Sequence, residues 1–470
     1  MLWGNTMLCG GTMLMRAAVG CLMLMLAACA PAPPAEVSKA RPFDVVPMIA
    51  RPAMKIFPAA PVSPPARSNA DIARDIMDLE FNLESGRPLP VLTRFDGPVT
   101  VAVTGRVPPT ALAELGHLMA RLRAEAGIDI SMAVGAKAAI TIEFLPRKHM
   151  QAAVPTAACF VAPRVSSWAE YRKARNSGAL DWTTLTRRET LAIFVPSDTT
   201  PQEVRDCLHE ELAQALGPLN DLYRLPDSVF NDDNFQAVLT GFDMLVLRFH
   251  NSPDLQNGML PNEVATRLPA ILADLNPLGQ VPGRAASQTN SRLWTIAIET
   301  ALGPNTALAK RTKAADQALM IAQNEGWKDN RLAFSYFAVG RLSLSKGIPR
   351  AIASFSRAAE LYQTLPDGPL HVAHVDMQMA ALALSSGQPQ VTINLADKAM
   401  PIAMIAQNAA LLATFMLLKA QALDQLGRAD EAQALRLDSL GWARYGFGSD
   451  DDVRARMADI AALSLIEIGG

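Results

Sequence analysis

The chain has 470 residues, of which 43 are basic and 45 acidic, so its formal net charge at pH 7 is −2. There is no basic excess and the two signs are mixed along the chain, which argues against nucleic acid as a partner. Roughly 400 residues follow an N-terminal region of distinct composition, enough for two or three domains with cores of their own.

The first 28 residues have the features of a signal peptide. Arg16 precedes an apolar stretch over residues 19–26, and the stretch ends in Leu-Ala-Ala-Cys at residues 26–29. The apolar run is about half the ~20 residues that a helix needs to cross a bilayer, so we expect a cleaved signal and not a membrane span. The four residues resemble the lipobox of bacterial lipoproteins, which implies cleavage before Cys29 and a lipid on its thiol. Because Ala30 and not Asp follows, the resemblance also implies sorting to the outer membrane; in an ordinary secretory signal Cys29 would be incidental.

Residues 29–67 are predicted to tether the folded part to the lipid. This stretch is rich in Pro and Ala and includes the pairs Pro33-Pro34 and Pro64-Pro65. Such a composition favours extended, solvated chain over a packed core. We therefore expect the folded part to be held off the lipid surface.

The cysteines are consistent with export. Cys9, Cys21 and Cys29 fall in or at the end of the predicted signal peptide, which leaves Cys159 and Cys207. An even pair in an oxidising compartment predicts a disulfide; two reduced, buried thiols are the alternative.

Residues 68–262 are predicted to form one domain, because helical and strand patterns alternate along them. The fold class predicted here is α+β, with an α/β sheet domain, and a linker over residues 263–290 would follow it. The apolar spacing predicts helices over residues 72–83, 108–126 and 201–216 and strands over 99–103, 139–144 and 190–195.

Residues 291–465 are predicted to be all-helical and repetitive. Glycines recur at 40-residue intervals, and a small residue stands seven positions before each of them. Small residues let paired helices approach closely, and glycine ends the first helix of a pair. The pattern resembles the tetratricopeptide repeat with a period longer than the usual 34 residues, and an irregular helical domain is the alternative. At least three helix pairs are expected, with a fourth over residues 291–327. The positions are Gly340 and Gly347, Ala380 and Gly387, and Ala420 and Gly427.

The helix at residues 201–216 carries the pattern with most bearing on chemistry. Residues 207–221 read Cys-Leu-His-Glu-Glu-Leu-Ala-Gln-Ala-Leu-Gly-Pro-Leu-Asn-Asp. Metzincin zinc proteases place two ligands one helical turn apart, a general base beside the first, and a third ligand after a glycine turn. Aligned on the glycine, these positions hold Glu210 as first ligand, Glu211 as base, Gln214 as second ligand and Asn220 as third. All three histidines of the motif are absent, and a frame based on His209 places alanine at the second ligand.

Residues 69–260 resemble the domain of unknown function 2927, a family of secreted bacterial proteins. The family pattern is Glu-Glu-x-x-Gln-x-Leu-Gly, Asn-Asp, Ser-(Ile/Val)-Phe-Asn-Asp, Leu-Thr-x-x-Asp and Gly-Met. Residues 248–253, Arg-Phe-His-Asn-Ser-Pro, depart from the Leu-Tyr-Asp-Pro usual before the final pair. The resemblance implies a degenerate zincin-like fold but no established activity. The matching residues are Glu210, Glu211, Gln214, Leu216, Gly217, Asn220, Asp221, Ser228, Phe230, Asn231, Asp232, Asp243, Gly258 and Met259.

Three interpretations of the Glu-Glu-Gln helix stay open. The first is a hydrogen-bonded cluster of Glu210, Glu211 and Gln214 without a cofactor. The second is a site for a hard divalent cation, because the oxygens of these glutamates, Asn220, Asp221 and Asp232 suit calcium or magnesium. The third is a zinc hydrolase with Glu211 as general base. Uncharged amides are poor zinc ligands, which favours the first.

The pair His371 and His374 would lie one turn apart on a repeat helix. No third ligand is evident in the sequence, so we expect the two imidazoles on a solvated helix face and not at a metal.

The sequence thus predicts a lipid-anchored protein on the periplasmic face of the outer membrane. It would bind an unidentified protein or peptide through its repeats, contact the membrane through its lipid, and contain an inactive zincin-like domain. The alternative is a cell-envelope metallopeptidase whose repeats recruit substrate.

Overall fold

The computed structural model describes residues 52–57, 63–65, 67–135, 138–155, 157–283, 291–304, 306–345, 347–366 and 368–463. The predicted signal peptide, Cys29 and most of the predicted tether lie outside these residues. Over the described ranges, no helix combines the length and the apolar character that crossing a membrane requires.

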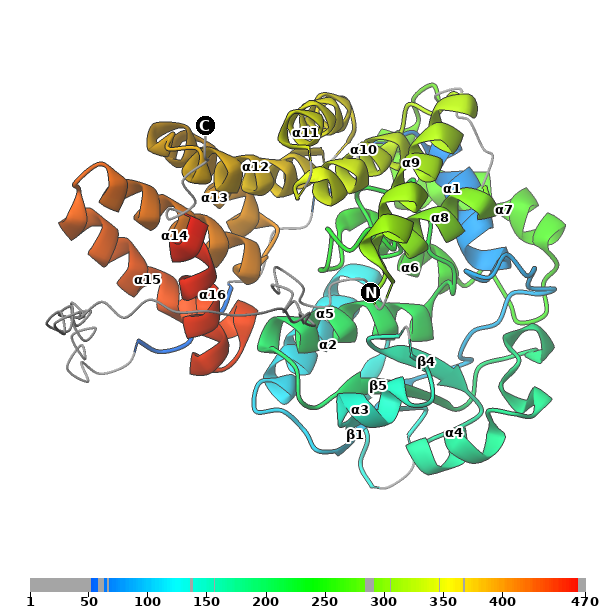
Figure 1. Ribbon diagram of the computed structural model, residues 1–470. Coiled ribbons are helices and arrows are strands. Elements are labelled where there is room, and N and C mark those ends of the chain that lie inside the picture. The colour runs from blue at the N-terminus through cyan, green and yellow to red at the C-terminus, as the bar shows by residue number, and fades with distance from the viewer. Residues whose placement is uncertain are drawn as a thin grey trace, which may run out of the picture. The chain divides into compact units, whose positions relative to one another are not determined.

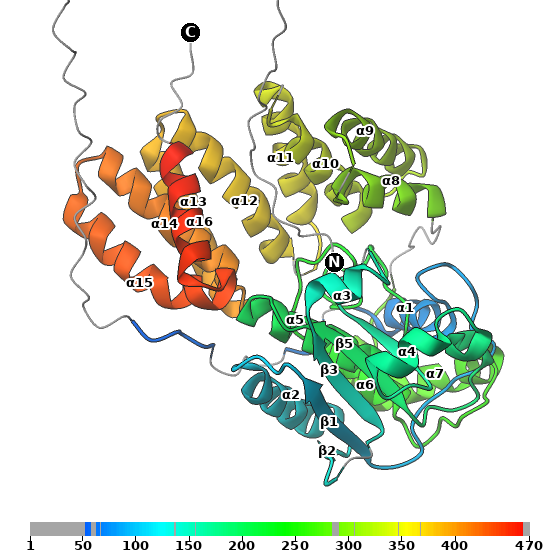
Figure 2. The ribbon, with the colours of Figure 1, turned by 60° about the horizontal axis from the view of Figure 1, so that its bottom comes forward.

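The first folded part is an α/β domain built on a five-stranded mixed sheet of order β2-β1-β3-β5-β4. Four strands are parallel, with Val101 opposite Ile140 and Ile142 opposite Ile193, and β4 runs antiparallel to β5 at one edge. The strands lie side by side in Figure 2. They are β1 (Val99–Gly105), β2 (Ile130–Met132), β3 (Ile140–Leu145), β4 (Phe160–Pro163) and β5 (Leu191–Pro196).

Helices cover both faces of this sheet, and the side chains of β5 point alternately toward the two sets of helices. Leu191, Ile193 and Val195 point into a core shared with the larger helices, whereas Ala192 and Phe194 point into a smaller core under α3 and α4. This is the two-residue period of a strand that is buried on both faces. The helices are α1 (Asn69–Phe81), α2 (Ala111–Ala126), α3 (Arg147–Gln151), α4 (Trp168–Ala174), α5 (Pro201–Leu216), α6 (Gly241–His250) and α7 (Pro261–Leu275), with short 3-10 turns at Gly178–Leu180, Trp182–Thr184 and Pro277–Gly279.

Helix α5 has the bounds that the sequence predicts, and its ends have clear causes. The Thr200 side chain accepts a hydrogen bond from the Glu203 backbone N–H, and proline occupies the first turn. The helix ends at Gly217, where a Cβ would come within 2.7 Å of the Leu247 side chain on α6. The predicted disulfide is confirmed: Cys207 is bonded to Cys159, with their Cα atoms 6.0 Å apart.

The second folded part is all-helical, as predicted, and its helices pack on their neighbours in chain order (Figure 1). The last helix, α16, also contacts α12 and α14. The elements are α8 (Arg292–Leu302), α9 (Leu308–Asn324), α10 (Asn330–Ser343), α11 (Ile348–Tyr362), α12 (Gly368–Ser385), α13 (Pro389–Ile405), α14 (Ala409–Gln425), α15 (Ala429–Phe447) and α16 (Asp450–Leu463).

The repeated glycines lie at the turns where the sequence places them. Gly387 and Gly427 follow the first helices of two pairs with φ values of +68° and +74°, a conformation that L side chains rarely adopt. Gly347 precedes α11 directly. A Cβ at Gly340 would come within 2.7 Å of the Phe355 ring, so close helix approach at this position is also confirmed. The helical repeats are therefore real, and residues 291–327 form the additional pair α8–α9.

Parts of the predicted tether and of the predicted linker are packed on the folded parts. Residues 54–57 lie on α15: the Lys55 backbone N–H donates to the Gly441 carbonyl over 3.2 Å, and the Phe57 ring stacks on Trp442 with centroids 4.5 Å apart. The tether prediction is wrong for residues 54–57, because Phe57 packs on the aromatic side chain of Trp442. Residues 263–275, assigned to a linker, lie in α7, whose buried Val264 and Leu268 pack on the domain core.

The solvated face predicted for His371 and His374 is wrong. Both side chains are buried, because Phe235 of the α/β domain lies against them: its ring stacks on His374 with centroids 4.2 Å apart. The covering residue is more than 130 positions away in the sequence, so no pattern within α12 could reveal it.

Candidate functional site

The candidate site surrounds the C-terminal half of α5. Glu211 is buried there and Glu210 is half-buried. Arg188, which sequence reasoning missed, fixes the end of the helix: its guanidinium donates to the carbonyl oxygens of Gln214 and Ala215 over 2.8 and 2.9 Å. A buried cation at the last carbonyls of a helix complements the negative end of its dipole.

The two amides at zinc-ligand positions are engaged by separate protein groups. The Gln214 Nε2 donates to Oδ2 of Asp221 over 3.1 Å. The Asn220 Nδ2 donates to the carbonyl oxygen of Asp78 in α1 over 2.9 Å. Both side chains are buried, so each amide serves a hydrogen bond that the fold needs.

The nearby histidines are likewise engaged away from Glu210. The His209 Nδ1 accepts from the Leu239 backbone N–H over 3.1 Å. The His250 Nδ1 lies 2.9 Å from both carboxylate oxygens of Glu80. Burial lowers the pKa of both imidazoles, well below the ordinary value for His209. Within the part of the chain that the structure describes, no three or more His, Cys, Asp or Glu side chains are grouped so as to hold a metal ion.

The site brings together carboxyl groups. Burial, followed by the charges of Asp232 and Glu84, raises the pKa of Glu210 to about 8. Burial and then the charges of Glu210 and Glu84 raise the pKa of Glu211 well above its ordinary value. The pKa of Asp221 is also raised well above the ordinary value, by burial and then by the charge of Glu84. Glu84 stands in the turn after α1, where no motif marks it.

The carboxyl cluster therefore favours its protonated form. Oε2 of Glu211 and Oδ1 of Asp221 are buried and have no hydrogen-bond partner. An unpartnered oxygen in a buried position is costly as a carboxylate and much less so as a neutral carboxyl. A protonated Glu211 cannot accept a proton from water, so this environment opposes the role of general base.

The residues after α5 fix the loop that follows. The Asp243 carboxylate accepts from the Ser228 hydroxyl and from the backbone N–H groups of Val229 and Thr240 over 2.5, 3.2 and 2.8 Å. Burial raises the pKa of Asp243 to about 7. Phe230, where a metzincin has its Met turn, is fully buried in the domain core. This part of the pattern holds the backbone in place.

Residues 69–270 match the family model described as Protein of unknown function (DUF2927). This part of the chain is a DUF2927 domain. The match starts at the first residue of α1 and ends within α7, so the DUF2927 domain comprises the whole sheet and the carboxyl cluster. No curated protein and no solved structure matches the chain.

Proposed function

We propose that the protein is a lipid-anchored scaffold or binding protein at the periplasmic face of the outer membrane. Residues 1–28 are removed, Cys29 is the lipidated first residue, and the DUF2927 domain is a zincin-like domain without peptidase activity. The tetratricopeptide-like helices bind a protein or peptide. The observation that carries the proposal is the engagement of Gln214 and Asn220 by Asp221 and the Asp78 carbonyl.

Donor chemistry supports the loss of catalysis. Zinc in proteins is held by imidazole nitrogen, thiolate sulfur or carboxylate oxygen. At the ligand positions this domain offers one half-buried carboxyl, Glu210, whose pKa is raised to about 8, and two amides that already donate hydrogen bonds. A zinc ion at this place would have to displace the proton of Glu210 and would otherwise be held by the oxygens of two neutral amides, which are poor zinc ligands.

The packing of the helical region supports a scaffold. It contacts the DUF2927 domain at more than one helix pair: Asn330 of α10 donates to the Tyr223 carbonyl over 2.7 Å, and the Gln202 side chain of α5 donates to Asn408, which precedes α14, over 3.1 Å. The helical region therefore contacts the DUF2927 domain at helices that are far apart in the sequence. Repeat helices that hold one protein surface in this way are suited to hold others.

The test is hydrolysis of unfolded envelope proteins by the purified full chain, with Glu211→Gln as the matched variant. The proposal predicts no cleavage above background for either protein, with or without added zinc. Zinc-dependent cleavage that the substitution abolishes would replace the scaffold with a metallopeptidase.

A further inference from the structure

A short segment of the DUF2927 domain lies among the repeat helices. Residues 231–235 read Asn-Asp-Asp-Asn-Phe. Phe235 is 1% exposed and belongs to the hydrophobic core of α8–α16, not to that of the sheet. The segment therefore occupies the helical region as a bound peptide would.

The carboxylate of Asp233 is held by two repeat helices. Its Oδ2 accepts from Nδ2 of Asn330 on α10 over 2.6 Å and lies 3.1 Å from Nε2 of His371 on α12. Asp233 and His371 are 2% and 0% exposed. A carboxylate in such a position is bound by directed donors and not only by surface charge.

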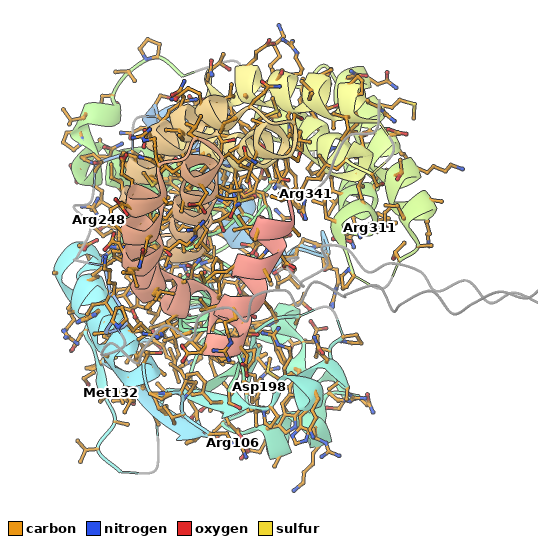
Figure 3. All side chains as sticks on the ribbon, turned by 60° about the vertical axis from the view of Figure 1, so that its left-hand side comes forward. Arg106, Met132, Asp198, Arg248, Arg311 and Arg341 are labelled. Atoms are coloured by element: carbon orange, nitrogen blue, oxygen red, sulfur yellow. A yellow bond between two sulfur atoms is a disulfide. The ribbon has the colours of Figure 1, made fainter. Side chains whose placement is uncertain are left out.

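The phenyl ring of Phe235 fills an adjoining aromatic pocket. It stacks on His374 and meets the edges of His371 and Phe337 at centroid distances of 4.9 and 5.2 Å. Arg341 of α10, labelled in Figure 3, lies over the Phe337 ring at 5.9 Å and adds a positive charge beside the pocket. The surroundings thus suit an acidic and aromatic segment.

Turns within residues 231–235 hold the Asp233 carboxylate and the Phe235 ring in position. The Asp233 backbone N–H donates to the Asn231 side-chain oxygen over 3.0 Å, and the Phe235 N–H donates to Oδ1 of Asp233 over 3.1 Å. Asn234 between them adopts φ +58°, which asparagine tolerates better than most residues. A carboxylate two positions before an aromatic ring is therefore the bound pattern.

With residues 231–235 bound, some buried polar atoms of the repeat helices have no hydrogen-bond partner. Oδ1 of Asn330, Nδ1 of His371 and the Tyr362 hydroxyl are buried and have no hydrogen-bond partner. Each such atom is costly while it lacks a partner. A ligand with the same carboxylate and ring and further polar groups would satisfy atoms that the internal segment does not.

We propose that the face of α10–α12 formed by Asn330, Phe337, His371 and His374 is a recognition site for peptide segments with a carboxylate two residues before an aromatic ring. The DUF2927 segment occupies it within the chain, and a partner protein with such a segment competes for it. The inference rests on the proposed binding function and names the chemistry of the partner.

The test uses a labelled peptide with the sequence of residues 230–238 and the full chain carrying Asp233→Ala and Phe235→Ala. A segment tethered within the chain competes at an effective concentration on the order of millimolar. The peptide should therefore bind the double variant at least ~10-fold more tightly than the wild type. Adding His371→Ala should weaken that binding at least ~10-fold. A peptide with Asn and Ala in place of its second Asp and its second Phe is the control.

Equal binding to wild type and double variant, no binding to either, or equal binding of the control peptide would overturn the proposal. If the double variant lacks a cooperative melt, hydrogen exchange of the wild type decides. Millimolar peptide should speed exchange at the Asp233 and Phe235 amides, and unchanged exchange would overturn the proposal. Neither result bears on hydrolysis, so failure here leaves the absence of peptidase activity untouched.

Discussion

The contribution of the disulfide to the free energy of unfolding can be estimated from the length of the loop that it closes. Replacing Cys159 and Cys207 by alanine opens a loop with a sequence separation of 48. The chain-entropy relation gives about 4 kcal/mol for a loop of that length at 25 °C. For a domain of this size, a loss of that order lowers the melting temperature by roughly 8–16 °C. Alanine is preferred to serine because Cys207 is fully buried and a hydroxyl there would add a desolvation cost.

The assay is thermal unfolding followed by near-ultraviolet circular dichroism, in which the sheet domain and the helices are resolved as separate transitions if they melt separately. Wild-type protein in reductant should show the same downward shift as the double variant. Equal melting of wild type with and without reductant, together with an unshifted variant, would refute the stabilising role of the cross-link.

Three further predictions concern packing, charge and processing. Gly340→Ala should destabilise the helical part by about 1–3 kcal/mol in urea titration through overpacking, whereas Gly347→Ala, with nothing closer than 3.7 Å to the new Cβ, should change little. The pKa of Glu210 is raised from 4.5 to about 8, so the stability of its protonated form is fully present below pH 4.5 and is lost as pH rises to 8. Glu210→Gln should therefore melt higher than wild type at pH 8 but not at pH 4; parallel pH profiles of the melting temperature for Glu210→Gln and wild type would contradict the shift. Cys29→Ser should leave an unlipidated precursor of higher mass by gel and mass spectrometry, and normal lipid labelling of this variant would contradict the assignment of the anchor.

Local chemistry explains what the sequence could predict. Proline after a capping hydroxyl marks the start of α5, and a glycine marks its end, so both bounds follow from adjacent residues. The 40-residue recurrence of Gly347, Gly387 and Gly427 reflects the turns between paired helices, and the positive φ values of Gly387 and Gly427 favour glycine at two of them. The Cys159–Cys207 pair follows from counting the cysteines that remain after the predicted signal peptide. Each of these signals is carried by neighbouring residues or by composition.

What could not be predicted depends on contacts between distant segments. His371 has the spacing of a surface pair and is buried only because Asp233 and Phe235 reach it from the other domain. Phe57 stands in a proline-rich stretch, yet Trp442 offers it an aromatic surface. Glu84 joins the carboxyl cluster from a turn without any motif. Neither periodicity nor composition encodes such pairings. The metzincin motif therefore places Glu210 and Gln214 at the positions of zinc ligands, but it does not reveal that Gln214 donates to Asp221.

The zinc content of the purified full chain tests the central claim most directly, with a variant carrying Glu210→His, Gln214→His and Asn220→His as the matched control. After equilibration with micromolar zinc and gel filtration, we predict far less than one zinc per wild-type chain and a marked gain in the variant that restores imidazoles. One zinc per wild-type chain, lost on Glu210→Gln, would contradict the account.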